Sequence, residues 1–312
     1  MAHTGEEHFE RYRIERYLGA TSWASSYIAF DQEERRLVRL KVMRPYISRD
    51  ESYAQEFLQK AADIQQIDHP NVIPILRFGS HEESLFLVSE YQETRLPLTN
   101  EQPLPATQVS AILIDLSRAL AHYETLGIHH LGVKQSNIFL ETDGKVWLSD
   151  FGIHPLPMPE DSSRPIRMSS KSAAFMAPEL RTERIQGTAA DIYSMGILAY
   201  LMCSGNTPFS SIIPEAIFAE QGLERIRPLS SSLPSVTPAI DTALLQSVAL
   251  KASSRQTSWQ ELIGTFQKLS SIEIPNATAP ETTITNPSPA LEHLHAAEPD
   301  ESVPHETLLQ CQ

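Results

Sequence analysis

The chain has 312 residues, enough for two lobes that share a substantial core. Hydrophobic residues make up 41% of it and charged residues 21%, a balance typical of a soluble globular protein. The formal net charge of −14 argues against a general affinity for nucleic acid or for an anionic membrane surface.

The first eight residues are polar and acidic, so we expect residues 1–8 to be an N-terminal extension and not a signal peptide. The longest apolar run, residues 192–203, is too short for a bilayer and predicts a buried helix. Only two cysteines occur, Cys203 inside that run and Cys311 near the C-terminus, which favours a reducing compartment. We therefore expect a cytoplasmic protein with no membrane segment.

Residues 9–91 are predicted to form a small lobe rich in strands. Polar and apolar residues alternate in three segments, and two further apolar segments follow a predicted helix at about residues 50–67. The five predicted strands are residues 11–18, 25–31, 35–43, 72–80 and 84–91. They predict a mostly antiparallel sheet accompanied by one helix.

Residues 92–270 are predicted to be mainly helical. Apolar residues follow one helix face over residues 107–127, and short strands at 137–141 and 145–150 flank a turn. From residue 271 to 312 the chain has six prolines, seven acidic residues and no lysine or arginine, which predicts a disordered tail.

Eight segments occur in an order typical of one family. They are "LGATSWASSYIAFD", "VRLK", "DHPNVIPIL", "SEYQE", "GIHHLGVKQSNIFL", "SDFG", "FMAPEL" and "DIYSMGILAYLMCSGNTPF". Over residues 9–269 the chain resembles a bacterial Hanks-type serine/threonine protein kinase. The resemblance implies an α+β, two-lobed fold, with a five-stranded antiparallel N-lobe carrying one helix and a mainly helical C-lobe.

The resemblance also implies ATP and Mg²⁺ as ligands. Lys41 matches the lysine that holds the phosphates, Asp150 and Asn137 match the magnesium ligands, and Lys134 matches a second lysine of the catalytic loop. Three more positions match nucleotide contacts, namely Gly19 in the glycine-rich loop and Glu90 and Gln92 in the hinge.

The catalytic loop departs from the family pattern at its centre. The position of the catalytic aspartate holds Gly132, which has no side chain to accept a proton, and Leu131 replaces the preceding arginine. His130 remains, and we expect it to pack against Phe151 and to bond to the backbone. The adjacent His129 is an alternative base, although the family places that side chain elsewhere.

The glutamate that normally holds the phosphate lysine is also missing. Lys60 stands at its position, with Glu56 one helical turn earlier. Two ammonium groups about 4 Å apart repel by roughly 4 kcal/mol at an effective dielectric constant of 20. We therefore expect Lys60 to turn away, or the helix to rotate, and Lys41 to pair with Asp150.

The nucleotide pocket is altered as well. Thr21 and Ala24 replace the second and third glycines, and glycine permits the closest approach of backbone to phosphate. The resemblance places Ser26 and Arg39 over the adenine and Phe139 beneath it. Arg39 is expected to fill or cover the adenine site or, alternatively, to extend to solvent.

Positions that support the large lobe are retained. Asp191 matches the buried aspartate under the catalytic loop, and Glu179 and Arg255 match a family ion pair, with one residue fewer than usual before Arg255. Serines of the activation segment are candidate sites for another kinase, namely Ser162, Ser163, Ser169, Ser170 and Ser172.

These losses favour a pseudokinase that acts as a regulatory or scaffold protein in signalling. Its expected partner is a protein, such as another kinase or a signalling protein. Two alternatives stay open: a slow, atypical ATP-dependent kinase that uses Asp150, Lys134 and water, and a nucleotide-binding sensor without phosphotransfer.

Overall fold

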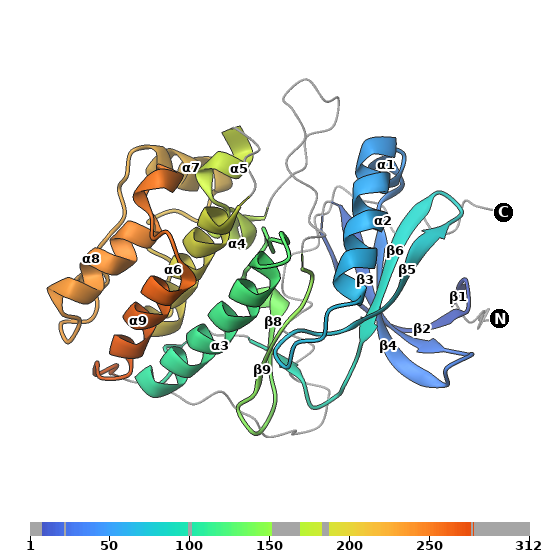
Figure 1. Cartoon of the computed structure of the whole chain (residues 1–312), viewed down its shortest axis with the longest axis horizontal. Coiled ribbons are helices and arrows are strands. Elements are labelled where there is room, and N and C mark those ends of the chain that lie inside the picture. The colour runs from blue at the N-terminus through green and yellow to red at the C-terminus, as the bar shows by residue number, and fades with distance from the viewer. Residues whose placement is uncertain are drawn as a thin grey trace, which may run out of the picture.

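The computed structural model describes residues 8–21, 23–98, 102–151, 169–182, 187–275 and 277. These residues form a sheet-rich lobe followed by a helical lobe, and the connection between the lobes passes along one side of the molecule (Figure 1). This arrangement is the predicted α+β, two-lobed fold. The predicted tail falls almost entirely outside the described residues, so its disorder and the proposed domain boundaries stay predictions.

The small lobe is built on a six-stranded antiparallel sheet. Its strands are β1 (His8–Phe9), β2 (Tyr12–Ala20), β3 (Ala24–Asp31), β4 (Arg36–Met43), β5 (Ile75–His81) and β6 (Ser84–Glu90). Their order in the sheet is β1-β2-β3-β4-β6-β5. The predicted count of five misses β1, because a two-residue strand has too few side chains to show an alternating pattern.

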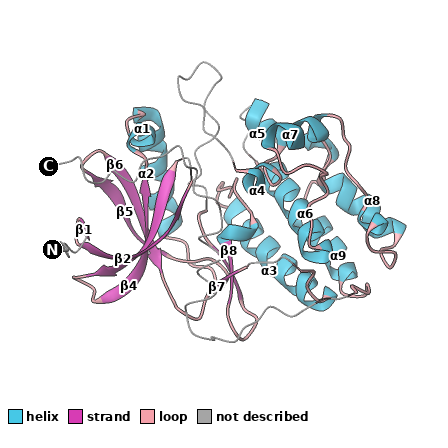
Figure 2. Ribbon diagram, turned by 180° about the vertical axis from the view of Figure 1, so that it is seen from behind, coloured by secondary structure: helices cyan, strands magenta, loops and turns pink. Residues whose placement is uncertain are grey.

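Helix α2 (Glu51–Gln65) covers one face of this sheet (Figure 2). Asp50 caps its first turn by accepting a hydrogen bond from the Tyr53 N–H at 3.0 Å. Its apolar stripe of Phe57, Ala61 and Ile64 is buried against the sheet. A short helix, α1 (Pro45–Ser48), precedes it and was not predicted, because one turn of helix carries no detectable periodicity.

A small sheet joins the two lobes behind the hinge. It consists of β7 (Leu96–Pro97), β8 (Ile138–Leu140) and β9 (Val146–Leu148), in that order. Phe139 of β8 lies directly opposite Trp147 of β9. The 3-10 helix η1 (Gln135–Asn137) precedes β8, so the catalytic loop leads straight into this sheet.

The large lobe is helical and packs around a central buried helix (Figure 1). Its helices are α3 (Ala106–Glu124), α4 (Ser170–Ala173), α5 (Pro178–Thr182), α6 (Thr188–Ser204), α7 (Pro214–Gly222), α8 (Pro238–Ser247) and α9 (Trp259–Leu269), with 3-10 turns η2 (Leu229–Ser231) and η3 (Ala252–Ser254). Nearly every side chain of α6 is buried, as its apolar sequence predicts. Within the described part of the chain, no helix has the length and apolar character needed to traverse a bilayer.

Candidate active-site cleft

The catalytic loop is held from beneath by one carboxylate on α6. Asp191 accepts the backbone N–H of His130 at 2.8 Å and the N–H of Leu131 at 2.7 Å. Burial raises the pKa of Asp191 to about 7, while the two N–H donors act in the opposite direction. The loop backbone is therefore fixed by the large lobe itself.

His130 is fully buried in a structural role, as predicted. Its Nδ1 accepts the Gly132 N–H at 3.1 Å, so its Nε2 carries the proton and donates to the Ser149 carbonyl at 2.8 Å. Its ring lies 4.7 Å from the Phe151 ring, which in turn stacks on Tyr123 at 4.0 Å. Burial lowers the pKa of His130 to about 4, so the imidazole stays neutral near pH 7.

The contribution of His130 to stability is expected to fall as the pH drops below about 6.5, whereas Asp191, with its raised pKa, acts in the opposite direction. The unfolded chain then protonates His130, whereas the folded chain does so only near pH 4. Between pH 7.5 and pH 5.5 this one histidine should cost about 1.4 kcal/mol of the free energy of unfolding. Urea denaturation at both pH values, with wild type and His130→Asn, measures it, and an equal pH dependence in the two proteins would contradict it.

Gly132, at the position of the catalytic base, takes part in the hydrogen bonds of the loop but has no side chain that could accept a proton. The Gly132 carbonyl accepts a hydrogen bond from the Asn137 side-chain amide at 2.9 Å. Leu131 is buried and has a left-handed backbone, with φ 59°. The loop therefore forms the expected turn around a position that has no acid or base.

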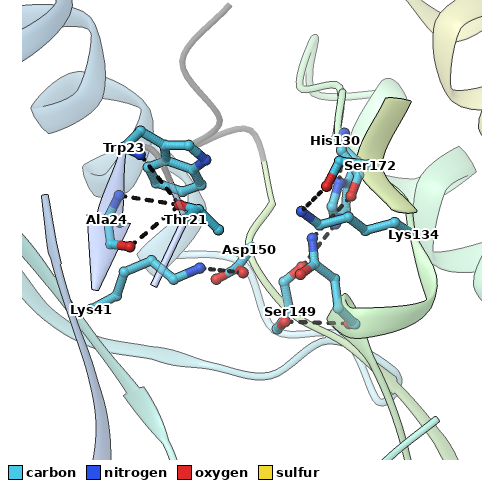
Figure 3. A network of polar contacts seen from close by, with 11 residues as sticks. Thr21, Trp23, Ala24, Lys41, His130, Lys134, Ser149, Asp150 and Ser172 are labelled. Atoms are coloured by element: carbon cyan, nitrogen blue, oxygen red, sulfur yellow. Dashed lines mark hydrogen bonds and ion pairs between the residues drawn. The ribbon is translucent and has the colours of Figure 1, made fainter. Parts of the chain in front are cut away.

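Two lysines and one aspartate form the charged centre of the cleft (Figure 3). Lys41 forms an ion pair with Asp150, as predicted, and both side chains are only 9% exposed. Burial lowers the pKa of Lys41, while the Asp150 charge raises it. Lys134 donates to the Ser172 hydroxyl at 3.2 Å, and burial together with the Lys41 charge lowers its pKa to about 8.

The α2 helix does not supply a glutamate to this centre. Lys60 pairs with Glu56 one turn away on the same helix, at 2.6 Å. The pairing of Lys60 with Glu56 was not predicted, whereas the pairing of the phosphate lysine Lys41 with Asp150 was.

The glycine-rich loop closes on itself through Thr21. The Thr21 hydroxyl accepts the Ala24 N–H at 3.1 Å, and the Thr21 N–H donates to the Ala24 carbonyl at 2.8 Å. Trp23, at the tip, turns inward, where its ring lies 5.1 Å from the Lys41 ammonium (Figure 3). Trp23 is 93% buried, since its exposed fraction is 7%, and it packs with the main core.

Sequence reasoning noted the lost glycines but missed this tryptophan. Its signal was present: Trp23 is the only large aromatic side chain among the small residues 19–26. A large apolar ring at the mouth of a cleft gains favourable free energy by burying its surface, and the Trp23 ring packs inward.

Arg39 packs across the cleft against Phe139, and the residue remains partly exposed. Its guanidinium carbon lies 4.9 Å from the centre of the Phe139 ring. Its Nε is buried and has no hydrogen-bond partner among the described residues. Burial lowers the pKa of Arg39, against the opposing effects of Asp150 and Tyr91. Arg39 thus contacts Phe139 and is partly exposed, so both the expectation that it fills the adenine site and the alternative that it extends to solvent stay predictions.

Besides Arg39 on β4, a second arginine packs on an aromatic ring near the cleft: Arg95, in the hinge, which was not predicted from the sequence. Arg95 forms ion pairs with Glu90 and, at 2.9 Å, with Glu141, and its guanidinium lies 3.6 Å from the Trp147 ring centre. The predicted hinge contact Glu90 is therefore engaged through its side chain, while Gln92 is exposed and its carbonyl accepts the Arg95 N–H at 3.1 Å. No motif marks Arg95, because two of its partners, Glu141 and Trp147, are distant in the sequence.

The predicted ion pair of the large lobe is present. Arg255 donates to both carboxylate oxygens of Glu179, at 2.6 and 2.8 Å. The pair forms even though one residue fewer precedes Arg255, and the 3-10 turn η3 (Ala252–Ser254) lies directly before it.

The activation segment is described only at its end. Ser169 and Ser172 share a hydrogen bond of 3.1 Å between their hydroxyls. Ser162 and Ser163, and Gly152 after Phe151, lie outside the described residues, as does the side chain of Ser170.

Comparison with known proteins agrees with this geometry. Residues 12–264 match the model of the protein kinase domain. The chain is 25% identical over 267 residues to the probable serine/threonine-protein kinase PknB of Lactococcus lactis, covering 84% of this chain and 42% of that protein. It is 25% identical over 307 residues to PknB of Mycolicibacterium smegmatis, covering 95% of this chain and 49% of that protein.

The chain thus spans less than half the length of these relatives. Among solved structures, a double mutant of the PknI kinase domain from Mycobacterium tuberculosis superposes with a TM-score of 0.69 at 21% identity, covering 86% of this chain and all of that one. That similarity establishes the fold, and the family match covers most of the sequence. The chain therefore belongs to the Hanks-type protein kinase family.

Proposed function

We propose that this chain is a pseudokinase, a kinase-like domain that regulates or scaffolds a protein partner and does not transfer phosphate. The observation that carries the proposal is the glycine at the base position of an otherwise well-supported loop. Loss of a general base commonly costs 10²–10⁴-fold in rate, on the order of 3–5 kcal/mol of activation free energy.

The nucleotide half of the cleft supports the same proposal. Asp150 and Asn137 are of the residue types that hold Mg²⁺, and Lys41 and Lys134 would neutralise phosphate charge. The base of a nucleotide, however, would have to displace Arg39 from its contact with Phe139, and Trp23 packs against the ammonium of Lys41.

Phosphate incorporation is the direct test. Wild type and Asp150→Ala would be incubated with radiolabelled ATP, in Mg²⁺ and separately in Mn²⁺, alone and with a general protein substrate. We expect equal, background-level incorporation in both proteins, beside an active bacterial kinase as positive control. Incorporation by wild type that disappears in Asp150→Ala would refute the proposal and favour the slow, atypical kinase.

A nucleotide-binding sensor is a second candidate, favoured by the retention of Asp150 and Asn137. Ligand at 100 times its Kd would raise the free energy of unfolding by about 2.7 kcal/mol. Thermal unfolding of wild type with ATP and Mg²⁺ separates this candidate from the scaffold, for which no stabilisation is expected. The partner is expected to be a protein, such as another kinase or a signalling protein.

A further inference from the structure

Four side chains from the small lobe, the hinge and the small sheet contact one another in series. The guanidinium of Arg39 lies 4.9 Å from the Phe139 ring centre, and that of Arg95 lies 3.6 Å from the Trp147 ring centre. Phe139 and Trp147 are cross-strand partners and form one buried cluster with Ile73. The order of the series is therefore Arg39, Phe139, Trp147, Arg95.

This series connects the two lobes. Arg39 belongs to β4 of the small lobe, whereas Phe139 and Trp147 belong to the small sheet that continues into the large lobe. Arg39 lies opposite Ser89, next to the hinge, and two residues from Lys41 on the same strand. The Arg39–Phe139 contact therefore bridges the cleft on the hinge side of the Lys41–Asp150 pair.

The Arg39 guanidinium lies over the Phe139 ring in the way that a flat nucleobase would lie over it. A guanidinium is planar and delocalised, and it stacks on aromatic faces. The Nε of Arg39 is buried without a hydrogen-bond partner among the described residues, so no carboxylate holds this atom in place. The favourable contact with Phe139 is what offsets the burial of the side chain.

We infer that Arg39 is the internal occupant of the nucleobase site and the residue that determines that the cleft rejects nucleobases. The Arg39–Phe139 stack replaces a ligand in bridging the lobes, and the Trp147–Arg95 stack supports Phe139 from the hinge side. The inference extends the proposed function, but it is tested by binding alone and does not depend on whether phosphate is transferred.

Calorimetric titration with adenosine tests the inference, because adenosine lacks phosphates and reports only on the base site. The proteins are wild type, Arg39→Ala, and Arg36→Ala as a matched control from an exposed position of the same strand. A desolvated stack of this kind corresponds to a factor of about ten or more in an equilibrium constant. We expect Arg39→Ala to bind adenosine at least about tenfold more tightly than wild type and Arg36→Ala.

A second variant, Phe139→Leu, keeps the inference testable if Arg39→Ala does not fold. Phe139→Leu removes the ring that holds the Arg39 guanidinium in place, so it should also gain adenosine affinity, by less than Arg39→Ala does. Unchanged adenosine affinity in the folded variants, or an equal gain in Arg36→Ala, would overturn the inference while leaving the phosphate-incorporation result intact. Conversely, phosphate transfer by wild type would refute the proposed function without altering a gain measured for Arg39→Ala.

Discussion

Substituting Arg255 with alanine is expected to lower the free energy of unfolding by about 3–5 kcal/mol. The Arg255 side chain has no exposed surface, and its removal would leave the Glu179 carboxylate, 7% exposed, without its bidentate partner. Arg255 also donates to the carbonyl groups of Ala189 and Ala249, at 2.8 and 2.9 Å, so the substitution leaves several buried acceptors unsatisfied. Urea denaturation monitored by tryptophan fluorescence measures the loss.

Two further variants separate the ion pair from general loss of packing. The double variant Glu179→Ala/Arg255→Ala should lose less than the sum of the two single variants, since neither charge is then left alone. Arg118→Ala breaks an exposed pair with Asp115 and should change stability by no more than about 1 kcal/mol. Strict additivity of the two buried substitutions would show that the pair is not the source of the effect.

Gly196→Ala is expected to destabilise the large lobe by about 2–3 kcal/mol. Gly196 lies in the middle of α6, where an added Cβ would come within 2.8 Å of Val248 Cγ1 and 3.1 Å of Ser247 Cβ. Ser247 has no exposed surface and its hydroxyl donates to the Leu244 carbonyl at 2.6 Å, so it cannot move aside easily. Urea denaturation of the variant measures the cost.

The matched control is Gly264→Ala in helix α9. An added Cβ at Gly264 meets no described atom within 4 Å. This variant should gain about 0.5–1 kcal/mol, the usual difference between alanine and glycine inside a helix. If both variants were stabilised alike, close packing between α6 and the end of α8 would not be what requires a glycine at position 196.

The fold and the framework of the cleft were predictable because they depend on local patterns and on family motifs. The alternation in residues 35–43 and the apolar face of residues 107–127 follow directly from strand and helix periodicity. The Lys41–Asp150 pair could be expected because Lys60 excluded the usual partner. Three of the elements that were missed, β1, β7 and α1, are too short for any periodic signal.

The contacts that fill the cleft could be predicted only in part. The sequence identified Arg39 and Phe139 as unusual, but it left open whether Arg39 points inward, since a long charged side chain can reach water in many ways. Arg95 and Trp147 are 52 positions apart by number, and only the pairing of β8 with β9 and the path of the hinge bring them together. Contacts between residues so far apart in the chain produce no recognisable pattern in the sequence around either residue.

Asp191 anchors the catalytic loop without constraining which side chain stands at position 132. The carboxylate grips the loop through the main-chain N–H groups of His130 and Leu131, which every residue except proline possesses. The loop's shape is therefore insensitive to which side chain stands at position 132. An acid at that position is therefore not required for the loop to keep its place on the large lobe.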